Sequence, residues 1–101
     1  MTTGPQSPPV LSNMPVAIEQ NVEWIAELIA YMRDNDIAAA EPVPEAEHGW
    51  VAHHDEVAVA TLLLGTDSWW VGANIPGKPR TLYPYVGGVA THRMICSQVA
   101  D

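Results

Sequence analysis

The residues best suited to chemistry lie in one stretch, residues 67–80. It holds the adjacent Trp69 and Trp70, two of the four cations of the chain (Lys78 and Arg80), and glycines and prolines that interrupt regular structure. Two adjacent indoles expose a large apolar surface if they are left in water. The pattern indicates a loop that closes over a flat, anionic ligand. The alternative is a loop that fills a core with Trp69 and leaves its cations in water.

The same stretch has the glycine and lysine spacing of a phosphate-binding P-loop, from Gly72 to Lys78. A P-loop continues with serine or threonine, which binds magnesium, and with a helix whose amide groups bind phosphate. The next residue here is Pro79, which has neither a hydroxyl nor an N–H group. The sequence therefore argues against a nucleoside triphosphatase.

The other acids and histidines form weaker patterns. Glu45 and His48 have the spacing of a helical metal-binding pair, but a di-metal bundle needs a second pair of this kind. His92 and Cys96 are close enough to touch on a helix, yet no third group orients the histidine as a base, so a small buried thiol is expected. His54 is expected to be partly buried. We predict no catalytic and no metal-binding residue in this chain.

A long helix is predicted over residues 14–34, after a glycine- and proline-rich loop over 1–13. Ser12 or Asn13 can cap it, and Pro15 suits its first turn. Apolar residues then recur at spacings of three and four, which places them on one helical stripe. The stripe consists of Ile18, Val22, Ile25, Ile29 and Met32.

The start of this helix is itself a candidate binding site. Its first turn presents unpaired amide groups and the positive end of the helix dipole. These features suit a carbonyl group or the pyrimidine edge of a reduced flavin. The alternative is an ordinary capped helix with no ligand.

Two more helices and one or two short strands follow. The second long helix is predicted over 45–64, with acids in its first turn, and a short C-terminal helix begins near Val89. Residues 37–41 and 81–86 are the candidate strands, although alanines weaken the first and a proline interrupts the second. The predicted fold class is α/β, rich in helix.

Length, charge and cysteine content narrow the class of protein. A chain of 101 residues forms one domain. Residues 1–67 carry a net charge of −10 and residues 68–101 a net charge of +2, which gives −8 in total. No basic stripe is present to neutralise nucleic-acid phosphates. The single cysteine excludes an internal disulfide, and no signal peptide or long apolar run occurs, so a soluble cytoplasmic protein with no membrane or nucleic-acid partner is expected.

Several segments together resemble the C-terminal part of a Baeyer–Villiger monooxygenase, of the phenylacetone and cyclohexanone monooxygenase type. The most specific is the run Gly-Ala-Asn-Ile-Pro-Gly-Lys-Pro at 72–79. The resemblance is collinear over essentially all 101 residues. The segments that carry it are 4–8, 11–14, 18–25, 68–80 and 85–88.

The resemblance implies an enzyme that uses FAD and NADPH to insert one oxygen atom of O2 into a ketone, giving an ester or lactone. Such enzymes contain two Rossmann-like α/β domains, of which residues 1–101 are a partial FAD/NAD(P)-binding fragment. By resemblance, Met14 lies at the FAD and in the substrate pocket, with Leu11 in the same pocket. Trp69 lies on the loop over 67–80, which closes over NADP. The resemblance assigns no phosphate contact to Lys78 or Arg80.

Parts of the family pattern are missing from this chain. The two glycine-rich dinucleotide fingerprints and the catalytic arginine of the family are absent from residues 1–101. The expected partners are therefore the remainder of the monooxygenase chain and a ketone substrate, and the isolated fragment is expected to be inactive. The alternative is a non-catalytic, small acidic helical interaction module or a gene remnant.

Overall fold

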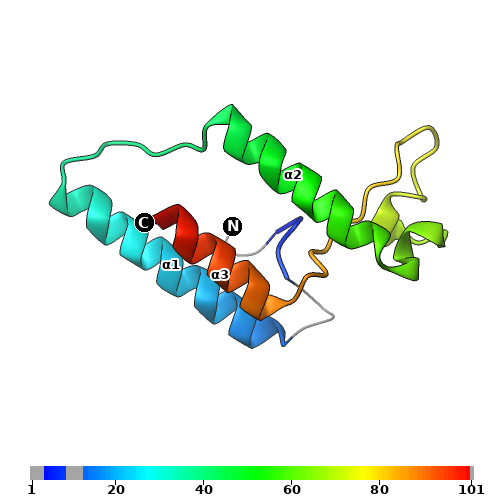
Figure 1. Ribbon diagram of the computed structural model, residues 1–101, viewed down its shortest axis with the longest axis horizontal. Coiled ribbons are helices and arrows are strands. Elements are labelled where there is room, and N and C mark those ends of the chain that lie inside the picture. The colour runs from blue at the N-terminus through cyan, green and yellow to red at the C-terminus, as the bar shows by residue number, and fades with distance from the viewer. Residues whose placement is uncertain (1–3, 9–12, 101) are drawn as a thin grey trace.

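Three helices form the framework of the protein, as a computed structural model shows for residues 4–8 and 13–100 (Figure 1). They are α1 (Met14–Asp34), α2 (Pro44–Val59) and α3 (Val89–Ala100). Two short 3-10 helices, η1 (Leu62–Gly65) and η2 (Trp69–Val71), follow α2. None of these helices is long and apolar enough to cross a membrane.

Helix α1 has the bounds that its capping residues predict. The side chain of Asn13 accepts a hydrogen bond from the N–H of Val16, at 3.4 Å, and Pro15 lies in the first turn, where no amide donor is needed. At the other end, both the backbone N–H and the side-chain amide of Asn35 donate to the carbonyl of Tyr31. These contacts satisfy groups that a helix end otherwise leaves unpaired.

Helix α1 packs side by side with α3, and the two helices run in the same direction (Figure 1). Ala17 and Gln20 are buried in this contact. The indole N–H of Trp24 donates to the carbonyl of Cys96 at 3.0 Å, and the amide of Gln20 donates to Nδ1 of His92 at 3.4 Å. The face of α1 that meets α3 is therefore not the apolar stripe recognised in the sequence.

Helix α2 ends at Val59, so the predicted helix over 45–64 is too long. Thr61 explains the early end, because its hydroxyl donates to the carbonyl of Ala58 at 2.8 Å and accepts from the N–H of Leu63 at 3.3 Å. A threonine that bonds to the backbone in this way competes with helical hydrogen bonds. The chain then turns into η1, where Leu62 is 92% exposed.

The two predicted strands are wrong: among the described residues the protein contains no strand. Residues 37–41 form an exposed linker to α2 with no neighbouring strand. The backbone of residues 81–86 makes hydrogen bonds to two different segments. The N–H of Tyr83 donates to the carbonyl of Trp70, and the carbonyl of Tyr83 accepts from the N–H of Gln6. Pro84 has no N–H to donate, so no ladder develops. The α/β class is not supported by this part of the chain, which is helical.

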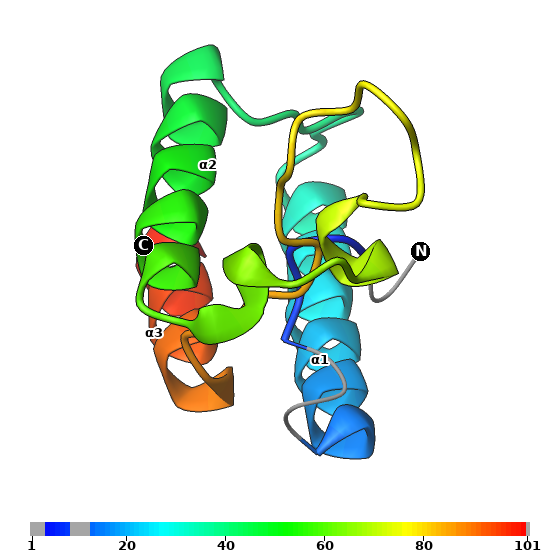
Figure 2. The ribbon, with the colours of Figure 1, turned by 90° about the vertical axis from the view of Figure 1, so that its right-hand side faces the viewer.

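The interior is organised around Tyr85, which is 1% exposed. Its ring lies between α2 and α3, with centroids 5.1 Å from Trp50 and 5.7 Å from both His53 and His92. Its hydroxyl shares a hydrogen bond of 2.9 Å with Nε2 of His53. Ala58, Val71 and Leu82 form a small apolar core. Val71 belongs to η2, on the side of the molecule that faces the viewer in Figure 2.

We expect Gly87→Ala to destabilise the protein, because a methyl group at residue 87 would collide with the hydroxyl oxygen and ring carbons of Tyr85. The ring is fully buried and cannot move away freely, so the cost should be about 1–3 kcal/mol in the free energy of unfolding. Urea denaturation followed by circular dichroism measures it.

Gly49→Ala is the matched control, because nothing lies within 4 Å of the added methyl group. Gly49 lies inside α2, so its replacement should stabilise the protein by about 0.5–1 kcal/mol. Equal effects of the two substitutions would contradict the close packing of Gly87 on Tyr85.

Candidate functional site

The tryptophan pair is divided between the core and the surface by η2. The hydroxyl of Ser68 accepts from the N–H of Trp70 at 3.2 Å, and Gly72 ends the turn with φ of 72°, a conformation that favours glycine. Val71 is fully buried and Trp70 packs on the core, while Trp69 is 63% exposed. The alternative in which Trp69 fills the core is therefore wrong.

The two indoles support each other at this turn. Their ring centroids are 5.7 Å apart and the rings meet edge to face, at 82°. Edge-to-face contact is a favourable arrangement for aromatic rings. The exposed indole of Trp69 is thus held in place by the partly buried indole of Trp70.

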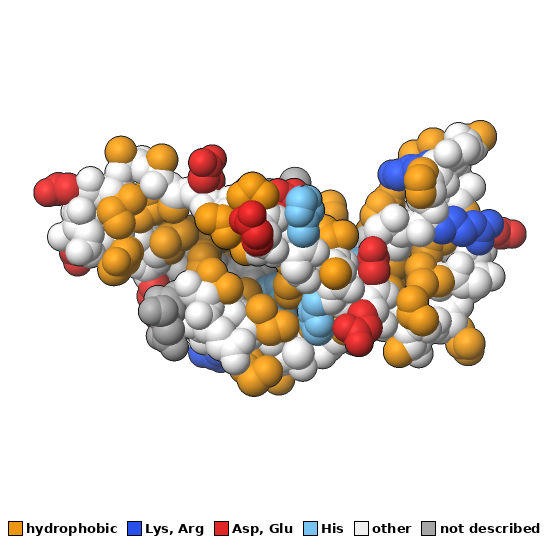
Figure 3. All heavy atoms as spheres, turned by 45° about the horizontal axis from the view of Figure 1, so that its top comes forward, with side chains coloured by type: hydrophobic (Ala, Val, Ile, Leu, Met, Phe, Trp, Pro, Cys, Tyr) orange, Lys and Arg blue, Asp and Glu red, His pale blue; other side chains and the backbone are white. Residues whose placement is uncertain are grey.

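Both cations of the loop have partners inside the chain. Arg80 forms an ion pair with Asp67 and donates to the carbonyl of Thr66 at 3.0 Å, so the two ends of the loop are joined. Lys78 donates to the hydroxyl of Tyr83 and lies 4.8 Å from the centroid of the same ring. On the face in Figure 3, basic side chains gather over the end of the molecule that this loop forms. The cations therefore do not extend free into water.

Met14, the other predicted site residue, lies in the first turn of α1 and is 39% exposed. Leu11 lies outside the described residues. Figures 1 and 2 show the first turn of α1 (blue) and the loop that follows Trp69 (yellow) at separate corners of the molecule. Within the described residues, the segments that carry Met14 and Trp69 therefore lie apart.

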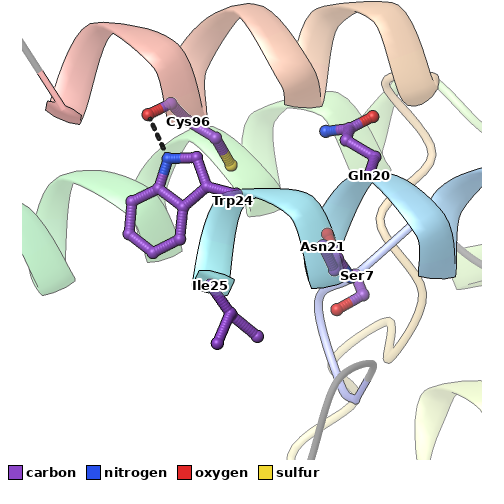
Figure 4. A pocket seen from close by; sticks show the side chains of 6 residues that line it. All are labelled: Ser7, Gln20, Asn21, Trp24, Ile25 and Cys96. Atoms are coloured by element: carbon purple, nitrogen blue, oxygen red, sulfur yellow. Dashed lines mark hydrogen bonds between the residues drawn. The ribbon is translucent and has the colours of Figure 1, made fainter. Parts of the chain in front are cut away.

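The structure contains a pocket that sequence reasoning missed (Figure 4). It lies beside α1 and α3, has a volume of about 240 Å³, and is mostly apolar. Neither Met14 nor Trp69 borders it. The only signal in the sequence was the four-residue spacing of Gln20 and Trp24, which places both on one face of α1. Its lining residues are Ser7, Gln20, Asn21, Trp24, Ile25 and Cys96.

The thiol of Cys96 and the imidazole of His92 are held in neutral forms. Sγ of Cys96 lies 3.7 Å from Nδ1 of His92, the nitrogen that also accepts from Gln20. Burial raises the pKa of the Cys96 thiol, and burial lowers the pKa of His92. Since the thiolate is the reactive form of cysteine, this pair is poorly suited to nucleophilic catalysis.

The buried histidines serve the fold. His54 is 1% exposed, more deeply buried than the sequence suggested, and its Nε2–H donates to the carbonyl of Pro84 at 3.3 Å. Its Nδ1 has no hydrogen-bond partner and lies 3.6 Å from the carboxylate of Asp55. In residues 4–8 and 13–100, no three His, Cys, Asp or Glu side chains are grouped as a metal site requires.

Comparison with known proteins gives a consistent result. The chain is 49% identical over 83 residues to acetone monooxygenase (methyl acetate-forming) of Gordonia sp. (strain TY-5), covering 82% of this chain and 16% of the relative. It is 39% identical over 101 residues to a Baeyer–Villiger monooxygenase of Pseudooceanicola batsensis, covering all of this chain and 18% of that protein. More distant relatives are named as FAD-binding monooxygenases. No family model matches the chain.

Solved structures show the same similarity. The crystal structure of cyclohexanone monooxygenase from Rhodococcus sp. Phi1 bound to NADP+ matches with a TM-score of 0.85 and 42% identity. The match covers 95% of this chain and 18% of that enzyme. The chain thus spans less than a fifth of the proteins that it resembles in sequence and in fold.

We expect the burial of His92 to make the stability of the chain fall as the pH drops below 6.5. Burial lowers the pKa of His92 below its usual value of 6.5. Below pH 6.5 the His92 side chain binds a proton in the unfolded chain but not yet in the folded chain. The stability that neutral His92 contributes is therefore complete above pH 6.5, and it is lost as the pH falls towards the lower pKa of the folded state. Thermal unfolding at several pH values, followed by circular dichroism, measures the change.

One variant makes this pH prediction specific. His92→Gln should remove a measurable part of the pH dependence, because the residue no longer titrates. A slope unaffected by His92→Gln would contradict the assignment.

Proposed function

The chain belongs to the Baeyer–Villiger monooxygenase family, and from this premise we propose that it forms the C-terminal part of an FAD- and NADPH-dependent enzyme. That enzyme inserts one oxygen atom of O2 into a ketone and gives an ester or a lactone. The cytoplasm is its expected location. The segment contributes walls to the site where the cofactors and the ketone meet.

The exposed indole of Trp69 is the observation that carries this proposal. Trp69 is 63% exposed, on a turn whose other residues, Trp70 and Val71, pack in the apolar core. An amphipathic indole held in place at a surface suits contact with a flat ligand. The ion pair of Arg80 with Asp67 joins the ends of the loop that follows Trp69. These features support a role for residues 67–80 in closing over NADP.

The first turn of α1 fits a place beside FAD. Met14 is partly exposed there, and the side chain of Asn13 satisfies the N–H of Val16. The N-terminus of a helix of this length carries partial positive charge, which favours an electron-rich ring edge. When bound, FAD supplies the redox chemistry with oxygen. Met14 would border the ring and the ketone, and Leu11 would border the same pocket.

The phosphate groups of the cofactors need other residues. Residues 1–101 contain no glycine-rich dinucleotide fingerprint, and both Lys78 and Arg80 are engaged within the chain. The Rossmann-like α/β units therefore belong to the remainder of the monooxygenase, and this segment supplies helices. We propose that the isolated chain is inactive.

The alternative of a small acidic interaction module or a gene remnant is less well supported. A module selected only for binding has no reason to keep 39–49% identity with oxygenases over 82–100% of its length. The similarity therefore favours the enzymatic proposal.

A hybrid enzyme tests the proposed function directly. The matching segment of the Rhodococcus cyclohexanone monooxygenase is replaced by residues 1–101, and NADPH oxidation is measured with and without cyclohexanone. We expect the hybrid to bind FAD and to couple NADPH oxidation to the formation of a lactone from cyclohexanone. A folded hybrid that binds FAD but forms no lactone would contradict the proposal, and so would activity of the isolated chain.

In this hybrid, Trp69→Ala should weaken NADP+ binding about tenfold, which corresponds to about 1.4 kcal/mol, because the indole surface is lost. FAD should stay bound, and more NADPH should be consumed per ketone converted. The matched control is Leu62→Ala, which removes a side chain 92% exposed in the preceding turn. NADP+ affinity is measured by titration. If the two variants had equal affinities for NADP+, Trp69 would not be part of the NADP-binding site.

A further inference from the structure

In the part of the chain that the structure describes, no helix packs on the apolar stripe of α1. Val22 is 46% exposed and Ile29 is 60% exposed, although both lie in the middle of a long helix. Successive helical residues are about 100° apart, so the stripe lies about 120° around the helix from the face that contacts α3. The acidic residues Glu19, Glu23 and Glu27 occupy the third face, which is exposed. Helix α1 therefore has one face for α3, one for water and one unoccupied apolar face.

The whole chain exposes more surface than a self-contained domain of its size. Its accessible surface is 7175 Å². A compact monomer of the same mass exposes about 5,600 Å², so the excess is roughly 1,600 Å². The radius of gyration is 15.3 Å, against about 13 Å for a compact domain of this length. This excess is larger than the area of about 800 Å² that one partner buries in a protein–protein interface of standard size.

The pocket beside α1 adjoins the stripe. Ile25 belongs to both, and Trp24 and Cys96 line the pocket from α1 and α3 (Figure 4). Its volume of about 240 Å³ accommodates a large apolar side chain from outside. Pockets of this kind, filled by one anchoring side chain, often dominate the energetics of an interface.

We infer that the stripe of Ile18, Val22, Ile25, Ile29 and Met32, together with the adjoining pocket, is the surface on which the rest of the monooxygenase polypeptide docks. That polypeptide is the occupant because the related enzyme of the same fold contains more than four-fifths of its chain outside the matching segment. The inference rests on the proposed function in one respect, because it takes the rest of the monooxygenase as the partner that covers the stripe. Docking on this surface does not require that the enzyme be active.

A second copy of this chain is a poorer occupant. Each copy carries a net charge of −8, so association brings two strongly acidic molecules together. Charge repulsion of this kind disfavours a stable dimer, whereas the remainder of an enzyme can provide an apolar surface without it. Self-association is nevertheless an outcome that the experiment distinguishes.

Co-expression tests the docking surface. The 101-residue chain is expressed with a tagged complement, meaning the Rhodococcus cyclohexanone monooxygenase from which the matching segment has been deleted. The chain should co-purify with the complement. Val22→Glu should weaken this association at least about tenfold, because a carboxylate would be buried without a partner.

Val16→Glu is the matched control. Val16 lies on the same helix with almost the same exposure, 47%, but about 160° around the helix from the centre of the stripe. This variant should keep the association within about twofold of the unaltered chain. Circular dichroism of the complexes and of each free chain checks that both variants keep their helix content.

Three results would overturn the inference. The first is that the unaltered chain fails to co-purify with the complement, and the second is that both variants lose the association equally. The third is that the chain forms a homodimer which Val22→Glu abolishes, while binding to the complement is unchanged. Association without lactone formation would support the docking surface and contradict the proposed function, so the two failures are distinguishable.

Discussion

The packing of Tyr85 is the constraint on which the rest of this structure depends. Its ring contacts residues of α2 and α3, and its backbone N–H donates to Ser7 of the N-terminal segment at 3.0 Å. Its hydroxyl needs a partner once it is buried, and His53 provides one. Gly87 completes the enclosure, because any side chain there would collide with the ring. One side chain thus connects regions that share few other contacts.

The two ends of the molecule are held together by different contacts. At one end, α1 and α3 are joined by hydrogen bonds from Trp24 and Gln20, while at the other end α2 packs on η1 and supports the loop that carries Trp69. Val71 and Leu82 fill the small core under that loop, so Trp69 is presented at the surface by rigid neighbours. A segment built in this way has a small apolar core, and much of its surface is available for contact with other parts of a protein.

Charge and polarity support the same view of the molecule. The acids are concentrated on exposed positions of α1 and α2. In the interior, burial lowers the pKa of His92 and raises the pKa of Tyr85 and Cys96, which favours the neutral form of each. Neutral buried groups with hydrogen bonds are compatible with a packed interior. The interior therefore stabilises the segment, and the features proposed to meet cofactors, Met14 and Trp69, are both exposed.

The sequence by itself determined those features whose causes are local. Asn13 and Pro15 set the start of α1, glycines and prolines keep residues 72–80 irregular, and the run at 72–79 indicated the monooxygenase family. Only the tertiary structure decided which face of α1 is buried, because the partners of Gln20 and Trp24 lie 72 residues further along the chain. It also decided that residues 81–86 form no strand, since strands require a neighbouring ladder that local sequence does not specify.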